Sequence, residues 1–326
     1  MSYLRQRLVL FAATLVAASA LIFAALEWLP GNAAQLMLGA EATPEAVAAL
    51  AAQLGLDRPA WSRYGQWLVG LVRGDLGLSH AYGTPVAELM LERLALTVPL
   101  ALLAMALTVA LALLAGWWAA SQQGRWGDHL VMALSQLGLA LPGFWLGMLL
   151  VLLFAVKLQW LDAGGFPGWR AELGGGLWPG LRALALPALS LALVQSAILA
   201  RLTRSALLEV AREDFMRSAR AKGLSRRAAL LRHGLRHAAI PLLTVGGLQF
   251  ANLLAGTIVI ENVFSLPGLG RLMAQAIANR DLIVVRNGVM GLVALVLLIN
   301  LVVDLLHAWA DPRLRQRAAA LGEAAA

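Results

Sequence analysis

The chain has 326 residues, of which 60% are hydrophobic and 13% are charged, and its formal net charge is +8. Soluble domains are nearer half apolar and a quarter charged, so this composition excludes an ordinary soluble fold and predicts an all-α integral membrane protein. The absence of cysteine excludes disulfides, thiolate metal sites and cysteine nucleophiles.

Apolar runs of about 20 residues, the length that spans a bilayer, recur along the chain and are bounded by charges or by Gly and Pro. They predict six transmembrane helices, over Leu8–Leu29, Leu96–Ala120, Leu130–Val156, Leu184–Leu202, Ile240–Ile260 and Gly288–Ala308. The first run is too long for a signal peptide and no small-residue cleavage site follows it, so we expect an uncleaved helix. The fourth is the shortest and weakest, which leaves a miscount by one span open.

The segment 30–93 lies between the first two predicted spans and is too long for a simple turn, so it predicts an external domain. Thr43 is expected to cap a helix whose first residue is Pro44 and which continues to Leu54. Large apolar residues at helical spacing follow, and we expect them on a protein wall or at the membrane interface. This stripe comprises Trp61, Tyr64, Trp67 and Leu68.

Basic residues are distributed unevenly between the two sides of the predicted membrane domain. Six spans place both termini on one side, together with Arg5, Arg7 and the dense basic segment 201–236, whereas the opposite side carries many acids. The positive-inside rule then places both termini in the cytoplasm. The predicted parts are helix 1–29, external segment 30–93, membrane domain 94–308 and cytoplasmic tail 309–326, of which 317–326 is expected to be disordered.

The basic cytoplasmic segment predicts two helices. The first is expected to run from Arg201 through Lys222, and the second to end at His237, with a break at residues 223–225 between them. Ser225 is a suitable cap for the second helix. We expect Arg201 and Arg204 to contact anionic lipid head groups.

No catalytic residue and no metal site is predicted. A P-loop requires Gly-x-x-x-x-Gly-Lys-Ser/Thr, and neither Lys157 nor Lys222 follows Gly or precedes Ser or Thr. His233 and His237 have the spacing of a metal pair on a helix, but they lie between Arg232 and Arg236, so a solvated basic face is favoured.

Few ionisable residues fall inside the predicted spans. Glu27 lies near the outer end of the first span and Asp304 lies about three-quarters of the way along the sixth, and this scarcity argues against proton- or ion-coupled transport. Gln249 and Asn252 are candidates for lining a pathway, although they could instead hydrogen-bond between helices. Glycines in the same span permit close helix packing; they are Gly246, Gly247 and Gly256.

The basic segment also carries a family resemblance. The run Glu209–Ser225 closely resembles the coupling-loop motif of dipeptide/oligopeptide/nickel-class ABC importer permeases, and Arg236–Pro241 looks like the end of that motif. Further stretches are similar to the same class in the same order: Leu54–Pro59, Gly74–Ser79, Leu254–Arg271, Asp304 and Asp311–Arg313. Arg217 occupies the position where the broader superfamily often has Glu, and the distance from Gly223 to Pro241 is longer than in sugar importers, which argues against a sugar substrate.

The resemblance implies a type I ABC importer permease fold in the bacterial cytoplasmic (inner) membrane, with an external domain after the first helix. It implies a coupling loop at about 209–239 that contacts an ATPase, through Arg217, Ala219, Ala221, Lys222, Gly223, Leu224 and Ser225. The implied partners are a second homologous permease, two ABC ATPase subunits that bind ATP and Mg, a periplasmic or lipid-anchored substrate-binding protein, and membrane lipids. No cofactor in this chain and no nucleic acid is implied.

The substrate implied by the resemblance is a peptide or a related small solute such as chelated nickel. The short loop Lys157–Arg182 looks more like nickel-type members than dipeptide-type members. A secondary transporter not powered by ATP and an intramembrane enzyme or scaffold are the alternatives.

Overall fold

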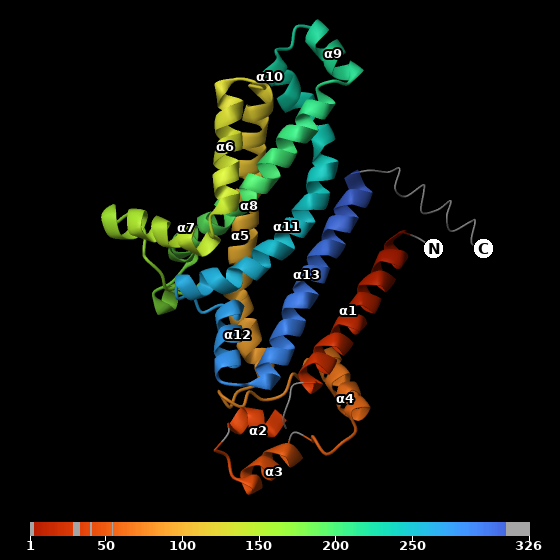
Figure 1. Ribbon diagram of the computed structural model, residues 1–326, viewed down its shortest axis with the longest axis vertical. Coiled ribbons are helices and arrows are strands. Elements are labelled where there is room, and N and C mark those ends of the chain that lie inside the picture. Colours follow the sequence, from red (N-terminus) through yellow and green to blue (C-terminus); the bar gives the residue numbers. More distant parts are fainter. Residues whose placement is uncertain (1–2, 29–32, 40, 54, 311–326) are drawn as a thin grey trace, which may run out of the picture. The chain divides into compact units, whose positions relative to one another are not determined.

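The computed structural model describes residues 3–28, 33–39, 41–53 and 55–310, which form helices joined by turns and loops (Figure 1). The prediction of an all-α protein is confirmed. The helices are α1 (Tyr3–Glu27), α2 (Ala33–Leu38), α3 (Pro44–Gln53), α4 (Ala60–Arg73), α5 (Val86–Ser121), α6 (Trp126–Ala140), α7 (Gly143–Leu150), the π-helix η1 (Val151–Lys157), the 3-10 helix η2 (Ala171–Leu173), α8 (Leu177–Val210), α9 (Asp214–Ala221), α10 (Arg226–Ala229), the π-helix η3 (Leu230–Gly234), α11 (Leu235–Val263), α12 (Leu269–Ala278) and α13 (Leu282–Ala310).

Five of the described helices are long and apolar enough to cross a membrane, and they match five of the predicted spans. They are Leu4–Glu27, Val86–Ser121, Leu177–Val210, Pro241–Val263 and Leu282–Ala308. The fourth predicted span belongs to α8, a helix of 34 residues, and is therefore not a weak element. The predicted span ended at Leu202, but the helix continues to Val210, and Arg204 in this extension pairs with Asp128 on α6.

The third predicted span was expected to be one continuous helix over Leu130–Val156, and that continuity is wrong. The structure divides it into α6 and the pair α7–η1, with a bend of 105° between them. Leu141 has an extended backbone, with φ −92° and ψ 131°, and Pro142 follows it. The ring of a proline disfavours helical geometry at the preceding residue, which explains the break. Counting the bent pair as one span gives up to six spans, as predicted.

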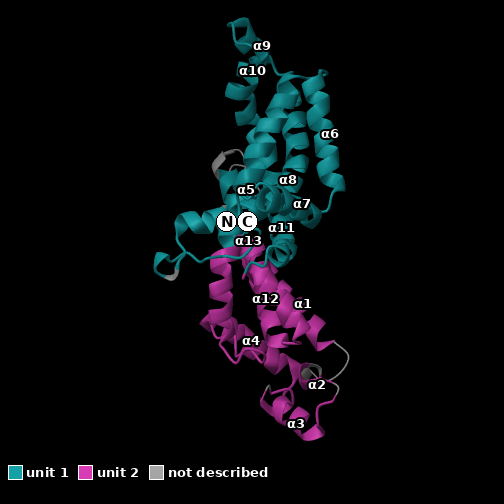
Figure 2. Ribbon diagram, turned by 90° about the vertical axis from the view of Figure 1, so that its left-hand side faces the viewer, with its two compact units in different colours: residues 1–7, 98–266, 299–326 teal, residues 8–97, 267–298 magenta. Residues whose placement is uncertain are grey.

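The chain divides into two compact units (Figure 2). Unit 1 comprises residues 1–7, 98–266 and 299–326, and unit 2 comprises residues 8–97 and 267–298. Within unit 1, α8 packs against α6, α7 and α11 and buries one face along most of its length. The basic segment 201–236 lies in this unit.

Unit 2 joins the segment after the first span to α12 and the start of α13. Asp281 accepts hydrogen bonds from the hydroxyl of Ser79, at 2.6 Å, and from the backbone amide of Ala81, at 3.0 Å. The indole Nε1 of Trp67 donates to Asn287 Oδ1 at 2.8 Å, and Asn287 Nδ2 donates to the carbonyl oxygen of Leu76 at 2.8 Å. Residues far apart in the chain therefore fix this unit.

The local predictions for the segment after the first span can be compared directly. Thr43 Oγ1 accepts a hydrogen bond from the amide of Ala46 at 3.3 Å, so the predicted cap at the start of α3 is confirmed. In the predicted stripe on α4, Trp67 is buried whereas Trp61 is 78% exposed. The predictions that involve Leu29, Pro30, Leu54 and residues 311–326 lie outside the described residues.

Candidate energy-coupling site

The basic segment 201–236 contains a short helix that stands apart from α8. The predicted continuous helix from Arg201 through Lys222 is wrong, because α8 ends at Val210 and α9 begins at Asp214. Acidic residues favour helix N-termini, and Glu213 and Asp214 stand together at this new start. The break lets α9 turn its apolar residue Met216 toward the rest of unit 1, where this side chain is 2% exposed.

The predicted break after α9 is confirmed, and it forms a Schellman turn. Gly223 has a φ of +94°, the left-handed region that favours glycine. Its amide donates to the carbonyl oxygen of Arg220 at 2.9 Å, and the amide of Leu224 donates to that of Ala219 at 3.3 Å. A Cβ atom at Gly223 would meet nothing within 4 Å, so a substitution there is opposed by backbone strain rather than by crowding.

The predicted cap of the second helix is also confirmed, since Ser225 Oγ accepts from the amide of Ala228 at 3.3 Å. The predicted end of this helix at His237 is wrong. Helical structure continues through α10, η3 and α11 to Val263, with Pro241 inside α11. Membrane helices tolerate an internal proline because neighbouring groups can satisfy the freed carbonyl. The Gly223 turn is therefore connected by helical backbone to the fifth span.

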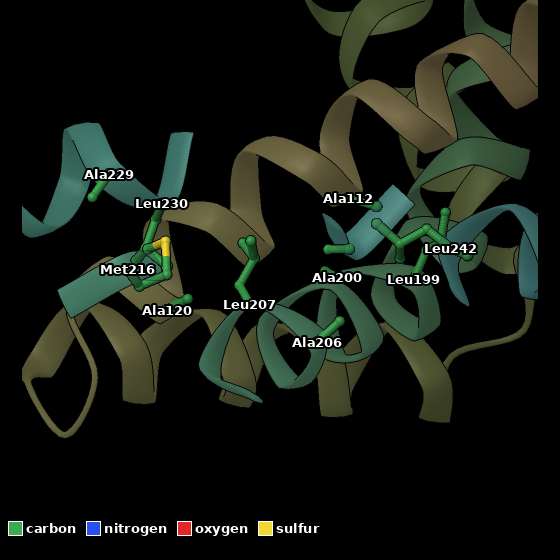
Figure 3. Close-up of a cluster of buried hydrophobic side chains, with 11 residues drawn as sticks. Ala112, Ala120, Leu199, Ala200, Ala206, Leu207, Met216, Ala229, Leu230 and Leu242 are labelled. Atoms are coloured by element: carbon green, nitrogen blue, oxygen red, sulfur yellow. The ribbon is translucent and has the colours of Figure 1, made fainter. Parts of the chain in front are cut away.

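One face of the segment from α9 to η3, residues 214–234, is buried in a hydrophobic cluster (Figure 3). Met216 from α9 and Leu230 from η3 pack there with Leu207 from α8 and Ala120 from α5, and Leu224 packs against the same cluster. Leu207 and Leu230 have no exposed surface. Burying such side chains stabilises by about 1.5–3 kcal/mol each, so the cluster holds α9 and α10 firmly on unit 1.

Polar contacts fasten the same segment to the end of α5. Arg226 Nη2 donates to the carbonyl oxygen of Ala120 at 3.2 Å and to the side-chain oxygen of Gln123. The carbonyl oxygen of Arg227 accepts from Trp117 Nε1 at 3.3 Å, and the Arg227 guanidinium lies 5.3 Å from the ring centre of Trp118. The α5–α6 connection therefore supports α10 directly.

Asp128 on α6 forms a two-pronged ion pair with Arg204 on α8. The Nε–Oδ1 and Nη2–Oδ2 distances are 2.5 and 2.7 Å, and the amide of Gly124 also donates to Asp128 at 2.9 Å. Asp128 is buried, whereas the Arg204 side chain is 27% exposed, so the lipid contact expected for Arg204 stays a prediction beside this pair. Sequence reasoning missed Asp128; the one available indication was a lone acid at the start of a span.

The opposite face of the same segment, residues 214–234, is open to solvent. Most of the residues that the resemblance assigned to ATPase contact are exposed, and Ala219 and Leu224 are half-buried. The exposed members are Arg217, Ala221, Lys222, Gly223 and Ser225. Arg217 pairs with Asp214 at 3.0 Å, and both side chains are largely exposed. The ring of His237 packs 4.5 Å, centre to centre, from that of Phe215.

The two candidate pathway residues lie one turn apart on α11. Gln249 is buried, Asn252 is exposed, and Asn252 Nδ2 donates to Gln249 Oε1 at 3.2 Å. Gly256 on the same helix permits close packing, since a Cβ there would lie 3.0 Å from a methyl carbon of Leu191 on α8. The structure thus brings the two amides together on a closely packed helix.

The structure is thus that of a multi-span helical protein in which the short, exposed helix α9 is anchored on the long helices of unit 1. The chain belongs to the family described as the binding-protein-dependent transport system inner membrane component, whose model matches residues 112–316. The N-terminal model of such membrane components matches residues 1–101.

Similar proteins support the same assignment. The chain is 44% identical to a putative peptide transport system permease protein of Brucella abortus, over 90% of this chain and 93% of that protein. It is 37% identical to a dipeptide transport system permease protein of Alkalihalophilus pseudofirmus, over 97% of this chain and 99% of that protein. It is 38% identical to a glutathione transport system permease protein of Escherichia coli, over 97% of this chain and 100% of that protein.

The resemblance drawn from the sequence is therefore confirmed. The chain is a multi-pass inner-membrane permease of an ABC importer, with the type I permease fold. It is a transport subunit rather than an enzyme, and it works with an ATPase and a substrate-binding protein. This assignment excludes the alternatives of an ATP-independent secondary transporter and an intramembrane enzyme.

Proposed function

We propose that α9, the Gly223 turn and α10 form the element through which an ATPase subunit drives this permease. The contact residues are Arg217, Ala219, Ala221, Lys222, Gly223, Leu224 and Ser225. The observation that carries the proposal is the contrast between the two faces of this element. Met216 and Leu230 are buried in the cluster, whereas the Gly223 turn is exposed. The buried face fixes this element on the rest of unit 1, and the exposed face is accessible to a partner protein.

Continuous helical backbone connects this element to the fifth span. Because α10, η3 and α11 follow one another without a loop, a displacement at Ser225 is passed to the fifth span. Within unit 1, α11 packs against α8, and α8 also packs against α6 and α7. Movement of the coupling element therefore changes the packing of several spans. Gln249 and Asn252 on α11 are proposed to line the pathway that this movement opens.

The expected ATPase surface is acidic. A cavity of about 180 Å³ beside α9 is lined by three arginines and by no acidic residue. The arginines are Arg212, Arg220 and Arg226. An acidic side chain of the ATPase would find charge-assisted hydrogen bonds there. The ATPase subunits also hold the ATP and Mg, since this chain has no P-loop lysine.

The complete importer is proposed to contain a second homologous permease, two ATPase subunits and a periplasmic or lipid-anchored binding protein, with both termini of this chain in the cytoplasm. The arginine asymmetry of the sequence supports this orientation. We propose a peptide or a related small solute as substrate, because the relatives are named for peptide, dipeptide and glutathione transport. Chelated nickel is the alternative.

Cysteine cross-linking tests the coupling role, because the chain has no cysteine of its own. Ala221→Cys places a thiol on exposed α9, and Arg125→Cys places one on the exposed α5–α6 connection as a matched control. With the assembled importer, we expect a cross-link to the ATPase from position 221 and a weaker one, or none, from position 125. Cross-linking from position 125 without any from position 221 would refute the assignment.

A further inference from the structure

Unit 2 contains a second feature, which is separate from the coupling element and goes beyond its proposed role. A cavity of about 320 Å³ lies where the end of α1, helix α4 and the start of α13 meet. Its walls include apolar side chains from both spans, among them Phe23, Leu26, Leu282 and Ile283. Two guanidinium groups, those of Arg63 and Arg286, line the same space.

The two arginines differ in their partners. Arg63 forms an ion pair with Glu27, and its Nε donates to the carbonyl oxygen of Arg58 at 3.2 Å. Arg286 Nε is buried and has no hydrogen-bond partner among the described residues. Asp75 also lines the cavity, but no ion pair within the described ranges joins it to Arg286.

The Arg286 side chain is nevertheless held in a defined position. Its guanidinium carbon lies 4.8 Å from the ring centre of Trp67. Trp67 is 5% exposed, and Asn287 accepts the hydrogen bond of its indole at 2.8 Å. A cation–π contact only partly replaces the water that a guanidinium loses on burial. Arg286 is thus a positioned cation that lines the cavity, and no ion pair within the described ranges neutralises it.

We propose that this cavity binds a phosphate group, with Arg286 as its main partner. The spans α1 and α13 end beside the cavity, at Glu27 and Leu282, which places it at the level of the membrane interface. Lipid phosphates are concentrated at this depth. Phosphate oxygens accept two parallel hydrogen bonds from a guanidinium, and the apolar wall of Phe23, Leu26 and Leu282 suits the glycerol and first acyl carbons of a lipid. The ligand class is therefore a phosphate diester. A phospholipid head group is the expected source, because lipid phosphates lie at the same depth as the cavity.

Native mass spectrometry of the assembled importer tests this site. Purified wild type is compared with Arg286→Gln, with Arg286→Lys and with Arg73→Gln, which removes an exposed arginine of α4 that does not line the cavity. Phosphatidylglycerol is the lipid probe and glycerol phosphate is the water-soluble probe. We expect Arg286→Gln to retain phosphatidylglycerol about ten-fold less well, because a charge-assisted hydrogen bond is lost. Arg286→Lys should lose less, and Arg73→Gln should match wild type.

The two probes separate the possible sources of the phosphate. Displacement of the lipid by glycerol phosphate would assign the site to a soluble phosphate ester, whereas retention against an excess of it would assign a lipid head group. Equal lipid retention by Arg286→Gln and Arg73→Gln would overturn the proposal.

Should the Gln variant fail to assemble, arginine modification by phenylglyoxal in the wild type decides the matter. Phosphatidylglycerol is expected to protect Arg286 and not Arg73. Equal modification of Arg286 with and without the lipid would refute the site.

Discussion

Arg7 in α1 and Asp304 in α13 form an ion pair, with 3.0 Å between Nη1 and Oδ2. Both residues belong to unit 1, and both side chains are about one-third exposed, at 37% and 32%. On sequence alone, Asp304 lies about three-quarters of the way along the last predicted span. The structure gives it a basic partner on the first span, which explains how an acid is accommodated in an apolar helix.

Substituting Arg7 and substituting Asp304 should lower the stability of the protein by different amounts. Arg7→Gln leaves a carboxylate in an apolar span without this cation and is expected to destabilise the protein by about 2 kcal/mol. Asp304→Asn leaves an arginine that can extend toward the membrane interface, so its effect should be smaller. The double variant should recover most of the loss. Thermal unfolding of the three variants in detergent measures this, and equal losses for both single variants would contradict it.

Gly223 provides a test of the coupling turn. Gly223→Val places a β-branched residue at a φ of +94° and should strain the turn, so substrate uptake and substrate-stimulated ATP hydrolysis should fall together. Gly223→Asn is the matched control, because asparagine tolerates left-handed backbone and should retain more of both activities. Uptake is normalised to the amount of protein in the membrane. Wild-type uptake by the Val variant would reject the coupling role.

The Asp128–Arg204 pair should matter more than its exposed counterpart. Asp128→Asn removes the charge from a buried carboxylate with two short hydrogen bonds to Arg204, and we expect a loss of stability of ~2 kcal/mol. Asp214→Asn removes an exposed pair with Arg217 and should change stability by less than ~0.5 kcal/mol. Denaturation midpoints in detergent compare them. A similar shift of the denaturation midpoint for both variants would show that burial does not make the Asp128–Arg204 pair stronger than the Asp214–Arg217 pair.

The orientation can be checked by labelling single cysteines in intact cells. Ala51→Cys and Glu172→Cys should react with an impermeant reagent from outside, whereas Arg232→Cys should react only after the cells are opened. Glu172 is preferable to Gly175, where a Cβ would lie 2.6 Å from the carbonyl oxygen of Pro167. Labelling of position 232 in intact cells would reverse the proposed topology.

The absence of a P-loop predicts that the isolated permease hydrolyses no ATP. Hydrolysis should appear only when ATPase subunits are added. A phosphate-release assay on the highly purified chain measures this. Activity that disappears on substitution of a residue in this chain would contradict the proposed division of labour.

Features that depend on nearby residues were predictable from the sequence. Thr43 and Ser225 cap helices as expected, and Gly223 ends α9 in the expected turn, because each depends on backbone groups within a few positions. The early end of α8 at Val210 was not predictable from local pattern, since Met216, just beyond it, packs with Ala120, which lies 96 positions away (216 − 120). Asp128 and Arg204 are 76 positions apart, and no local pattern connects them.

The break at Leu141–Pro142 has a consequence for the surroundings of the third span. A helix that stops leaves its last carbonyl groups without helical partners. In hydrocarbon each such group would cost several kcal/mol, so lipid cannot surround it. In the assembled importer the corner between α6 and α7 must therefore face water or another protein surface. A partner subunit packed against this corner would shield the same carbonyl groups that lipid cannot satisfy.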